Sequence, residues 1–317
     1  MSRFRIFSVW NFVFLMAIVV LFLLVVYPMG SIFQASLLSA DTGEFTWDNY
    51  LSVFTTKFYR RCLWNSFFLS ALATVFSVII GVPFAFLTTR YKLPHANILK
   101  TLGTLPLILP TFIGAEAWLL LLGRNGILTQ FFHSIGLNTP SIYGWQGVVL
   151  VYTLQFFPFV FLMVSAAINS VDRSLEESAR NLGASPWRVF RTVTLPVVTP
   201  SIASGALIVF CMSIENFGVP TIIGNDYKVL AEQAYSEFVS EMGGNPSMAG
   251  ALSTVLVIIT LALTILQKVF VERKSYSMSA LRPPEILPLS KWKTRFAWLY
   301  CAGLVFISLA PFLVVLV

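Results

Sequence analysis

Long apolar runs separated by short polar segments dominate the hydrophobic pattern of the chain. A helix needs about 20 predominantly apolar residues to cross the hydrocarbon core of a bilayer. Seven stretches meet this requirement, at roughly 9–33, 62–88, 101–123, 146–169, 201–223, 248–270 and 296–317. The pattern therefore predicts an all-α membrane protein with seven transmembrane spans.

Proline interrupts several of these predicted spans. Pro106 and Pro110 fall in the third span, and Pro158 falls in the fourth. Bundled membrane helices tolerate such residues because neighbouring groups satisfy the freed backbone atoms. In the fifth span, Glu215 and Asn216 directly precede a Phe-Gly-Val-Pro sequence. We expect that helix to bend or break there.

Basic residues fall mainly on one side of the predicted membrane. With a cytoplasmic N-terminus, only five of the 21 basic residues lie outside, namely Lys57, Arg60, Arg61, Arg124 and Lys228. An excess of Lys and Arg in cytoplasmic loops is the general rule for membrane proteins. The formal net charge of +7 is thus explained by membrane orientation, and no nucleic-acid partner is expected.

The composition excludes a soluble globular domain. The chain has 317 residues, of which 57% are hydrophobic and only 11% are charged, whereas soluble domains have about 25% charged residues. Its three cysteines share no spacing typical of a disulfide framework or a metal site. The sequence also lacks the G-x-x-x-x-G-K-[ST] phosphate loop, so we expect ATP binding, if it is needed, from a partner.

The spans divide the chain into three predicted parts. Residues 1–271 hold six spans and form one transmembrane domain. Residues 272–295 are polar, basic and contain several prolines, which is typical of a cytoplasmic linker. The span at 296–317 carries a late proline, as the first span does. Repeated halves are common in transporters, so we interpret this span as the first of a second half, with an abruptly ending seven-span protein as the alternative.

The polar segment between the fourth and fifth spans has the clearest local signals. Ser174 and Glu177 have the spacing of a capping box at a helix start. Gly183 is placed to end this helix in the left-handed conformation. Pro186 suits the first position of a second helix, which Pro196 is expected to end. The pattern predicts a short cytoplasmic helix-turn-helix whose exposed ends are free to bind a partner.

This segment resembles a known family. Glu177-Ser178-Ala179, then Gly183, then Leu195-Pro196 is similar to the EAA loop of permease subunits in binding-protein-dependent ABC importers. Ser178 replaces a family Ala and Val193 a family Ile. The resemblance also covers the six-span arrangement of residues 1–271. Within the family, segments 154–158, 175–187 and 216–220 look most similar to the fused, two-half permeases of ferric iron importers.

The resemblance implies that loop 174–196 is a coupling helix that seats in a cleft of a separate ABC ATPase dimer. Glu177 would cap the helix, Ala179 would allow close approach, and Gly183 would make the corner. The implied ATPase-coupling residues are Glu176, Glu177, Ala179, Gly183, Ala184, Leu195 and Pro196. The other implied partners are an extracytoplasmic substrate-binding protein and a second permease half, fused or separate. The implied location is the bacterial cytoplasmic (inner) membrane.

A few polar residues lie at membrane depth. Ionisable groups are costly there and usually face the bundle interior or a water-filled path. We predict that Glu116, Glu215, Asn216 and Gly218 line the translocation path. The alternative is that the carboxylic acids only form hydrogen bonds with neighbouring helices.

The substrate is the least determined part of this prediction. Carboxylates suit a cation such as ferric ion, a polyamine or thiamine. The resemblance puts ferric iron first, with polyamine, thiamine, phosphonate or sulfate behind it, because relatives with the same loop carry all these classes. An ion-coupled secondary transporter or channel is the alternative from another class, although it has no use for an ATPase-binding loop. Neither an H-E-x-x-H nor a G-x-S-x-G motif occurs in the spans. We therefore expect no catalytic residue, resident metal or cofactor.

Overall fold

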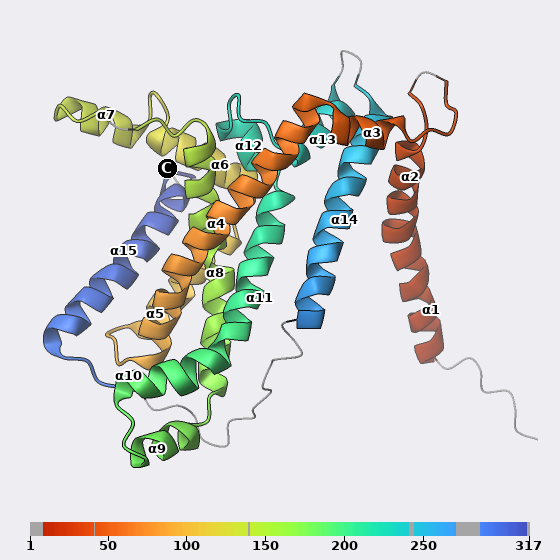
Figure 1. The fold of residues 1–317 in the computed structure, drawn as a ribbon. Helices are drawn as coiled ribbons and strands as arrows, with labels where there is room; N and C mark the ends of the chain where they lie inside the picture. The colour runs from red at the N-terminus through yellow and green to blue at the C-terminus, as the bar shows by residue number, and fades with distance from the viewer. Residues whose placement is uncertain (1–8, 41, 139, 241–243, 271–285, 316–317) are drawn as a thin grey trace, which may run out of the picture. The chain divides into compact units, whose positions relative to one another are not determined.

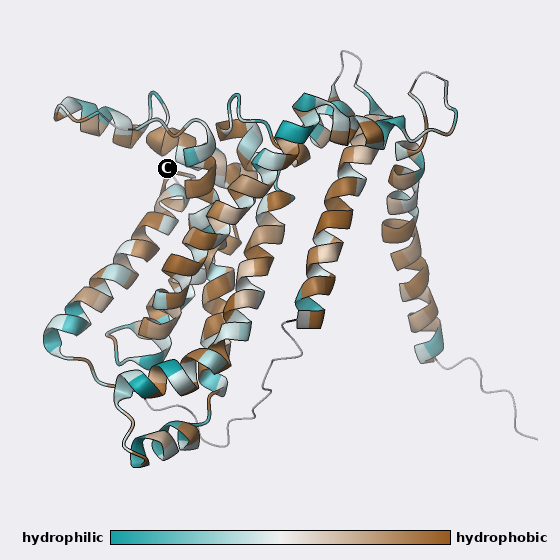
Figure 2. Cartoon of the chain, in the orientation of Figure 1, coloured by the Kyte–Doolittle hydropathy of each residue, from teal (hydrophilic) through white to brown (hydrophobic). Residues whose placement is uncertain are grey.

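A computed structural model describes residues 9–40, 42–138, 140–240, 244–270 and 286–315, and this part of the chain is built from helices (Figure 1). Six helices are long and apolar enough to cross a membrane: Val9–Ser36, Lys57–Arg90, Trp145–Ser170, Pro186–Ile214, Pro246–Val269 and Lys291–Val314. Figure 2 shows hydrophobic residues along the long helices and hydrophilic residues concentrated in short elements such as α9 (Arg173–Asn181). The predicted all-α membrane fold is confirmed.

The third predicted span is not a single helix. Ala96–Leu107 and Thr111–Ser134 are bent relative to each other by 103°, and they supply a seventh span only when counted as one broken element. In detail, α5 (Ala96–Thr104) continues into the 3₁₀ turn η2 (Leu105–Leu107), and α6 (Thr111–Leu122) begins after Pro110. Proline cannot donate a backbone N–H. The two prolines of this stretch therefore end one helix and begin another.

The fifth predicted span starts earlier and ends earlier than expected. Its helix includes α10 (Pro186–Val189), the π-helical turn η3 (Phe190–Thr194) and α11 (Leu195–Ile214). The prediction that Pro196 ends the cytoplasmic helix was therefore wrong. The π-helical turn explains this, because Leu195 N–H donates to the Phe190 carbonyl five residues back. Pro196 then falls in the first turn of α11, where its missing N–H is tolerated.

The first span contains the same device. α1 (Val9–Leu21) passes into the π-helical turn η1 (Phe22–Val26), and α2 (Tyr27–Ser36) follows with Pro28 in its first turn. In both spans a π-helical turn directly precedes a proline within the helix. Proline thus shifts the local hydrogen-bond register of these two spans without ending them.

The described chain forms two compact units. The larger one comprises Cys62–Glu232 and Ile259–Val317, and its most buried span is α8 (Trp145–Ser170). A Cβ atom added at Gly81 of α4 (Lys57–Arg90) would lie 3.0 Å from the Phe157 carbonyl oxygen of α8. One added at Gly205 of α11 would lie 2.9 Å from Val160 Cα. Small residues thus allow two helices to pack closely against α8.

The last helix, α15 (Lys291–Val315), also packs within the larger unit. Its Tyr300 hydroxyl donates to the Ile80 carbonyl at 2.8 Å, and Cys301 is fully buried. Most of the predicted linker lies outside the described residues, but Leu287 forms a parallel β-bridge with Tyr91. The assignment of α15 to a second half stays a prediction.

The smaller unit comprises Met1–Arg61 and Gln233–Ile258. It includes α1, α2, α3 (Asp48–Thr55), part of α13 (Leu230–Val239) and part of α14 (Pro246–Phe270). The Asn49 side-chain amide donates to the carbonyls of Ser36 and Leu38, at 2.9 Å each. A Cβ atom at Gly250 would lie 2.9 Å from the Ile32 carbonyl, so α14 and α2 approach closely there.

Within the larger unit, short helices cover both ends of the bundle. α9 and α10 lie at the end where α4 finishes, whereas α7 (Ile127–Ser134) and α12 (Gly218–Ile223) lie at the opposite end (Figure 1). The cytoplasmic segment predicted from the sequence therefore sits at one end of the helices. The helix break predicted at residues 217–220 is found slightly earlier, at residues 215–217, toward the other end.

Candidate functional site

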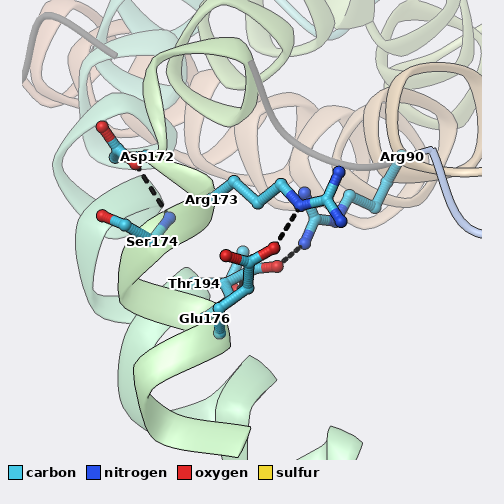
Figure 3. Close-up of polar contacts among 7 residues, drawn as sticks. Arg90, Asp172, Arg173, Ser174, Glu176 and Thr194 are labelled. Atoms are coloured by element: carbon cyan, nitrogen blue, oxygen red, sulfur yellow. Dashed lines mark hydrogen bonds and ion pairs between the residues drawn. The ribbon is translucent and has the colours of Figure 1, made fainter. Parts of the chain in front are cut away.

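The α9 helix begins two residues earlier than the predicted capping box requires. Asp172 is its N-cap, and its carboxylate accepts a hydrogen bond from Ser174 N–H at 2.8 Å (Figure 3). The capping box between Ser174 and Glu177 was therefore wrong. Glu177 instead pairs with Arg173 at 2.6 Å, and both side chains are 41% exposed. Asp is as good an N-cap as Ser, so the sequence offered two competing starts.

The corner after α9 has the predicted geometry. Gly183 has φ +83°, and a side chain is strained in this left-handed conformation. Gly183 N–H donates to the Arg180 carbonyl and Ala184 N–H donates to the Ala179 carbonyl, at 2.9 and 3.1 Å. These two bonds form a Schellman motif, which satisfies the last carbonyls of α9. Ser185 then caps α10.

Large apolar side chains are exposed at this corner. Leu182 is 89% exposed and Trp187 is 68% exposed, although both lie in a polar segment. Ala179 and Ala184 are half-buried beside them, while Leu195 is half-buried and Pro196 exposed further along the helix. Contiguous exposed apolar residues mark surfaces that bind other proteins or membranes. The corner therefore has the composition of a docking surface.

Glu176 points the other way and is almost fully buried. Its Oε2 atom pairs with the Arg90 guanidinium, and its Oε1 atom accepts from the Thr194 hydroxyl at 2.9 Å. Figure 3 shows these three side chains converging from three elements: the end of α4, α9 and η3. We call them the Arg90 cluster. Sequence reasoning placed Glu176 among the coupling residues but missed both of its partners.

The second group of predicted site residues lies where α11 ends. α11 stops at Ile214 and α12 starts at Gly218, which confirms the predicted helix break. Asn216 stabilises the break, because its side-chain oxygen accepts from Val219 N–H at 3.1 Å. Its backbone carbonyl accepts from the Tyr152 hydroxyl of α8 at 3.0 Å.

A side chain of α8 also stabilises the break between η2 and α6. Gln155 Nε2 of α8 donates to the Leu109 carbonyl at 3.1 Å. Tyr152 and Gln155 are three residues apart, so they share one face of α8. α12 packs against α6, and a Cβ atom at Gly218 would lie 3.1 Å from Phe112 Cβ. One face of α8 thus stabilises two adjacent helix breaks, and sequence reasoning missed both donors.

The two predicted membrane carboxylates are exposed in the isolated chain. Glu116 lies on α6, and Glu215 is the residue that follows α11. The described residues contain no group of three or more His, Cys, Asp and Glu side chains placed to hold a metal ion. Both carboxylates are therefore accessible on the surface of the isolated chain.

Comparison with known proteins identifies the class. Residues 3–276 match the family model of the binding-protein-dependent transport system inner membrane component, and the chain belongs to this family. It is 31% identical over 261 residues to the putative ferric transport system permease protein FbpB 1 of Haemophilus influenzae, which covers 82% of this chain and 41% of that protein. The chain thus spans less than half the length of this relative.

Relatives with other named substrates are similar at comparable identity. The molybdenum transport system permease protein ModB of Escherichia coli is 34% identical over 157 residues, covering 49% of this chain and 68% of ModB. The spermidine/putrescine permease protein PotB of Haemophilus influenzae is 30% identical over 210 residues, covering 63% and 72%. A bacterial alginate-importing ABC transporter has the same fold, with TM-score 0.67, 19% identity, and coverage of 84% of this chain and 95% of that chain.

Proposed function

We propose that this chain is the transmembrane permease part of an ATP-driven importer in the bacterial cytoplasmic membrane. A separate ATPase dimer hydrolyses ATP, and an extracytoplasmic binding protein delivers the solute. The α9 corner is the observation that carries the proposal. It exposes Leu182 and Trp187 at one end of the bundle and leads directly into the helix Pro186–Ile214. A protein bound at this corner has direct mechanical access to a membrane-crossing helix.

In this proposal the coupling residues have separate tasks. Leu182 and Trp187 contact the ATPase, Gly183 fixes the corner, and Ala179 and Ala184 keep its surface flat. Glu177 is half-exposed, and within the described residues it pairs with its own helix neighbour Arg173, so part of its carboxylate is accessible to the ATPase. The N-terminus is cytoplasmic, as the distribution of basic residues favours.

The proposed path runs past the two helix breaks. Irregular backbone at membrane depth is tolerated where it is buried in protein or lines a cavity. Glu215, Asn216 and Gly218 lie at the second break, and Glu116 lies in α6, the helix that follows the first break. Because exposed carboxylates are unfavourable against lipid, Glu116 and Glu215 face either the path or a second permease half, fused or separate.

Ferric ion is the first-choice substrate. The named ferric permeases cover most of this chain, and two carboxylates suit a hard cation that prefers oxygen ligands. Molybdate and polyamines follow, because relatives named for them are similarly identical. Thiamine, phosphonate and sulfate stay further alternatives.

The test is reconstitution of the permease with its ATPase in nanodiscs. ATP hydrolysis is measured with binding protein that is empty or loaded with ferric ion, molybdate or spermidine. We expect the ferric-loaded protein to give the strongest stimulation. If only another cargo stimulates hydrolysis, that cargo is the substrate, and the importer assignment still holds. Failure of any ATPase to co-purify would favour an ion-coupled carrier instead.

The path is tested separately with Glu215→Gln. This variant is expected to lower ferric uptake while ATPase binding is unchanged. Glu44→Gln is the matched control, because Glu44 is also an exposed carboxylate but lies in the loop before α3. Wild-type uptake in Glu215→Gln would remove this carboxylate from the path.

A further inference from the structure

The Arg90 cluster connects the coupling loop to other parts of the molecule. The exposed fractions of the Arg90 and Glu176 side chains are 7% and 3%. Both carboxylate oxygens of Glu176 are used, one by the α4 residue Arg90 and the other by Thr194. The backbone at Arg90 also binds a fourth segment, because Leu287 N–H donates to the Arg90 carbonyl at 2.9 Å. Leu287 lies on the approach to α15.

Stability alone is a poor explanation for this pair. Burying two charges costs desolvation energy that their attraction only partly returns, so well-packed apolar residues often do as well. What a buried ion pair does supply is geometry. It fixes the position of α9 relative to the end of α4 and to η3 more narrowly than apolar contact does.

Thr194 occupies a place where the helix can change register. It ends the π-helical turn η3, and such turns occur frequently at functional sites. Pro196 cannot donate a backbone N–H, so the helix has one fewer bond to hold this turn. The Thr194 hydroxyl bond to Glu176 therefore ties the least regular part of this span to α9.

Free space adjoins the cluster. A cavity of about 320 Å³ is lined by Arg90, Glu176 and Thr194 together with Trp187, Phe190 and Leu287. Within the described residues, the buried Arg90 Nη1 atom has no hydrogen-bond partner. Side chains of the cluster thus have both room to move and a spare donor to receive a different acceptor.

We propose that the Arg90 cluster transmits movement of the ATPase-bound α9 helix to α4, to α11 through η3, and to the approach to α15. Glu176 and Thr194 act as positioning residues in this step. Half-exposed Glu177 contacts the ATPase, whereas buried Glu176 passes the movement on. This inference rests on the proposed function and adds the internal route that the movement takes.

The test compares threonine variants in the reconstituted complex with its ATPase and ferric-loaded binding protein. The measured quantity is ferric ion accumulated per ATP hydrolysed. Loss of one hydrogen bond of about 1 kcal/mol corresponds to a factor of about five, so Thr194→Val should lower this ratio about fivefold while basal hydrolysis persists. Thr194→Ser keeps the hydroxyl and should retain the wild-type ratio.

Thr192→Val is the matched control, since Thr192 lies in the same π-helical turn but is exposed, and its hydroxyl donates to the Arg188 carbonyl of its own helix. It should also retain the wild-type ratio. A purely structural Thr194 would lower thermal stability without changing ferric ion per ATP, and that result would overturn the inference.

The double variant Arg90→Met/Glu176→Leu addresses the case in which single charge variants fail to fold. It should assemble with the ATPase and hydrolyse ATP, but loaded binding protein should no longer stimulate it. Wild-type coupling in this variant would overturn the inference and leave the proposed function standing. If binding protein fails to stimulate the wild-type complex with any of the candidate cargoes, the proposed function fails and the inference fails with it.

Discussion

Two places in the larger unit stabilise irregular backbone, and each uses different chemistry. We call the Arg90 cluster the charged level and the two helix breaks beside α8 the neutral level. At the end that carries α9, a guanidinium and a carboxylate meet in the Arg90 cluster. At the helix breaks, the neutral side chains of Tyr152 and Gln155 donate hydrogen bonds to the backbone carbonyls of Asn216 and Leu109, respectively. Charges are costly in a membrane interior. Neutral donors therefore suit the breaks, whereas the ion pair lies at the end of the bundle that carries α9.

The two levels also differ in how a substitution should act. Removing one member of an ion pair leaves a buried charge, whereas removing a hydroxyl or amide leaves one unsatisfied carbonyl. At the charged level, a single substitution should therefore cost much stability, and replacing both partners together should restore most of it. The neutral level should respond in small, nearly additive steps.

The largest effect is expected for Glu176→Leu, which leaves Arg90 buried without its partner. Breaking a buried pair costs about 3–5 kcal/mol, so the free energy of unfolding in mixed micelles should fall by that amount. The control Arg90→Met/Glu176→Leu should recover most of it, because no unpaired charge remains. If the single variant is as stable as the double variant, the buried unpaired charge is not costly, and the proposed difference between the charged and neutral levels is wrong.

The next effect is expected at the corner of α9. Gly183→Ala places a side chain at φ +83°, which costs about 1–2 kcal/mol for an L-residue. Thermal unfolding should report the loss, and Gly183→Asn should be milder because Asn tolerates this conformation. Gly303→Ala is the control: an added Cβ meets nothing within 4 Å there, and Ala favours helix. Equal losses at both glycines would contradict the left-handed corner.

Smaller effects are expected at the helix breaks. Tyr152→Phe and Gln155→Leu each remove one hydrogen bond, worth about 0.6–1.7 kcal/mol in a membrane protein. Both the free energy of unfolding and amide hydrogen exchange at residues 217–219 should change for Tyr152→Phe. Tyr143→Phe is a control outside α8. If these variants lose as much free energy of unfolding as Glu176→Leu, the helix breaks depend on their hydrogen bonds as strongly as the Arg90 cluster depends on its ion pair.

The smallest effect is expected for Glu177→Gln. Its pair with Arg173 joins two half-exposed side chains, and exposed pairs of this spacing contribute about 0.3–0.5 kcal/mol. The apparent melting temperature should therefore hardly change, although ATPase binding should weaken. Adjacent glutamates on one helix would then differ about tenfold in their contribution to stability. A large loss of stability would place Glu177 in the buried network as well.

Sequence patterns predicted the features that depend on short stretches of chain. Gly183 was identified as a corner because only its position and residue type matter. The break at residues 215–217 followed from polar residues before a Gly and a Pro. Prolines were harder to interpret, since Pro110 begins a new helix whereas Pro196 lies within a continuous one. The π-helical turn that makes the difference has no simple sequence signal.

The sequence by itself determined most of the membrane spans, the family, the corner of α9 and the helix break, because hydropathy, backbone freedom and proline chemistry act over a few residues. Only the tertiary structure decided which polar groups meet. Arg90 and Glu176 are 86 positions apart, and Tyr152 and Asn216 are 64 apart. Such pairs form because buried polar groups must find partners wherever packing brings them. No local pattern in the chain specifies that packing.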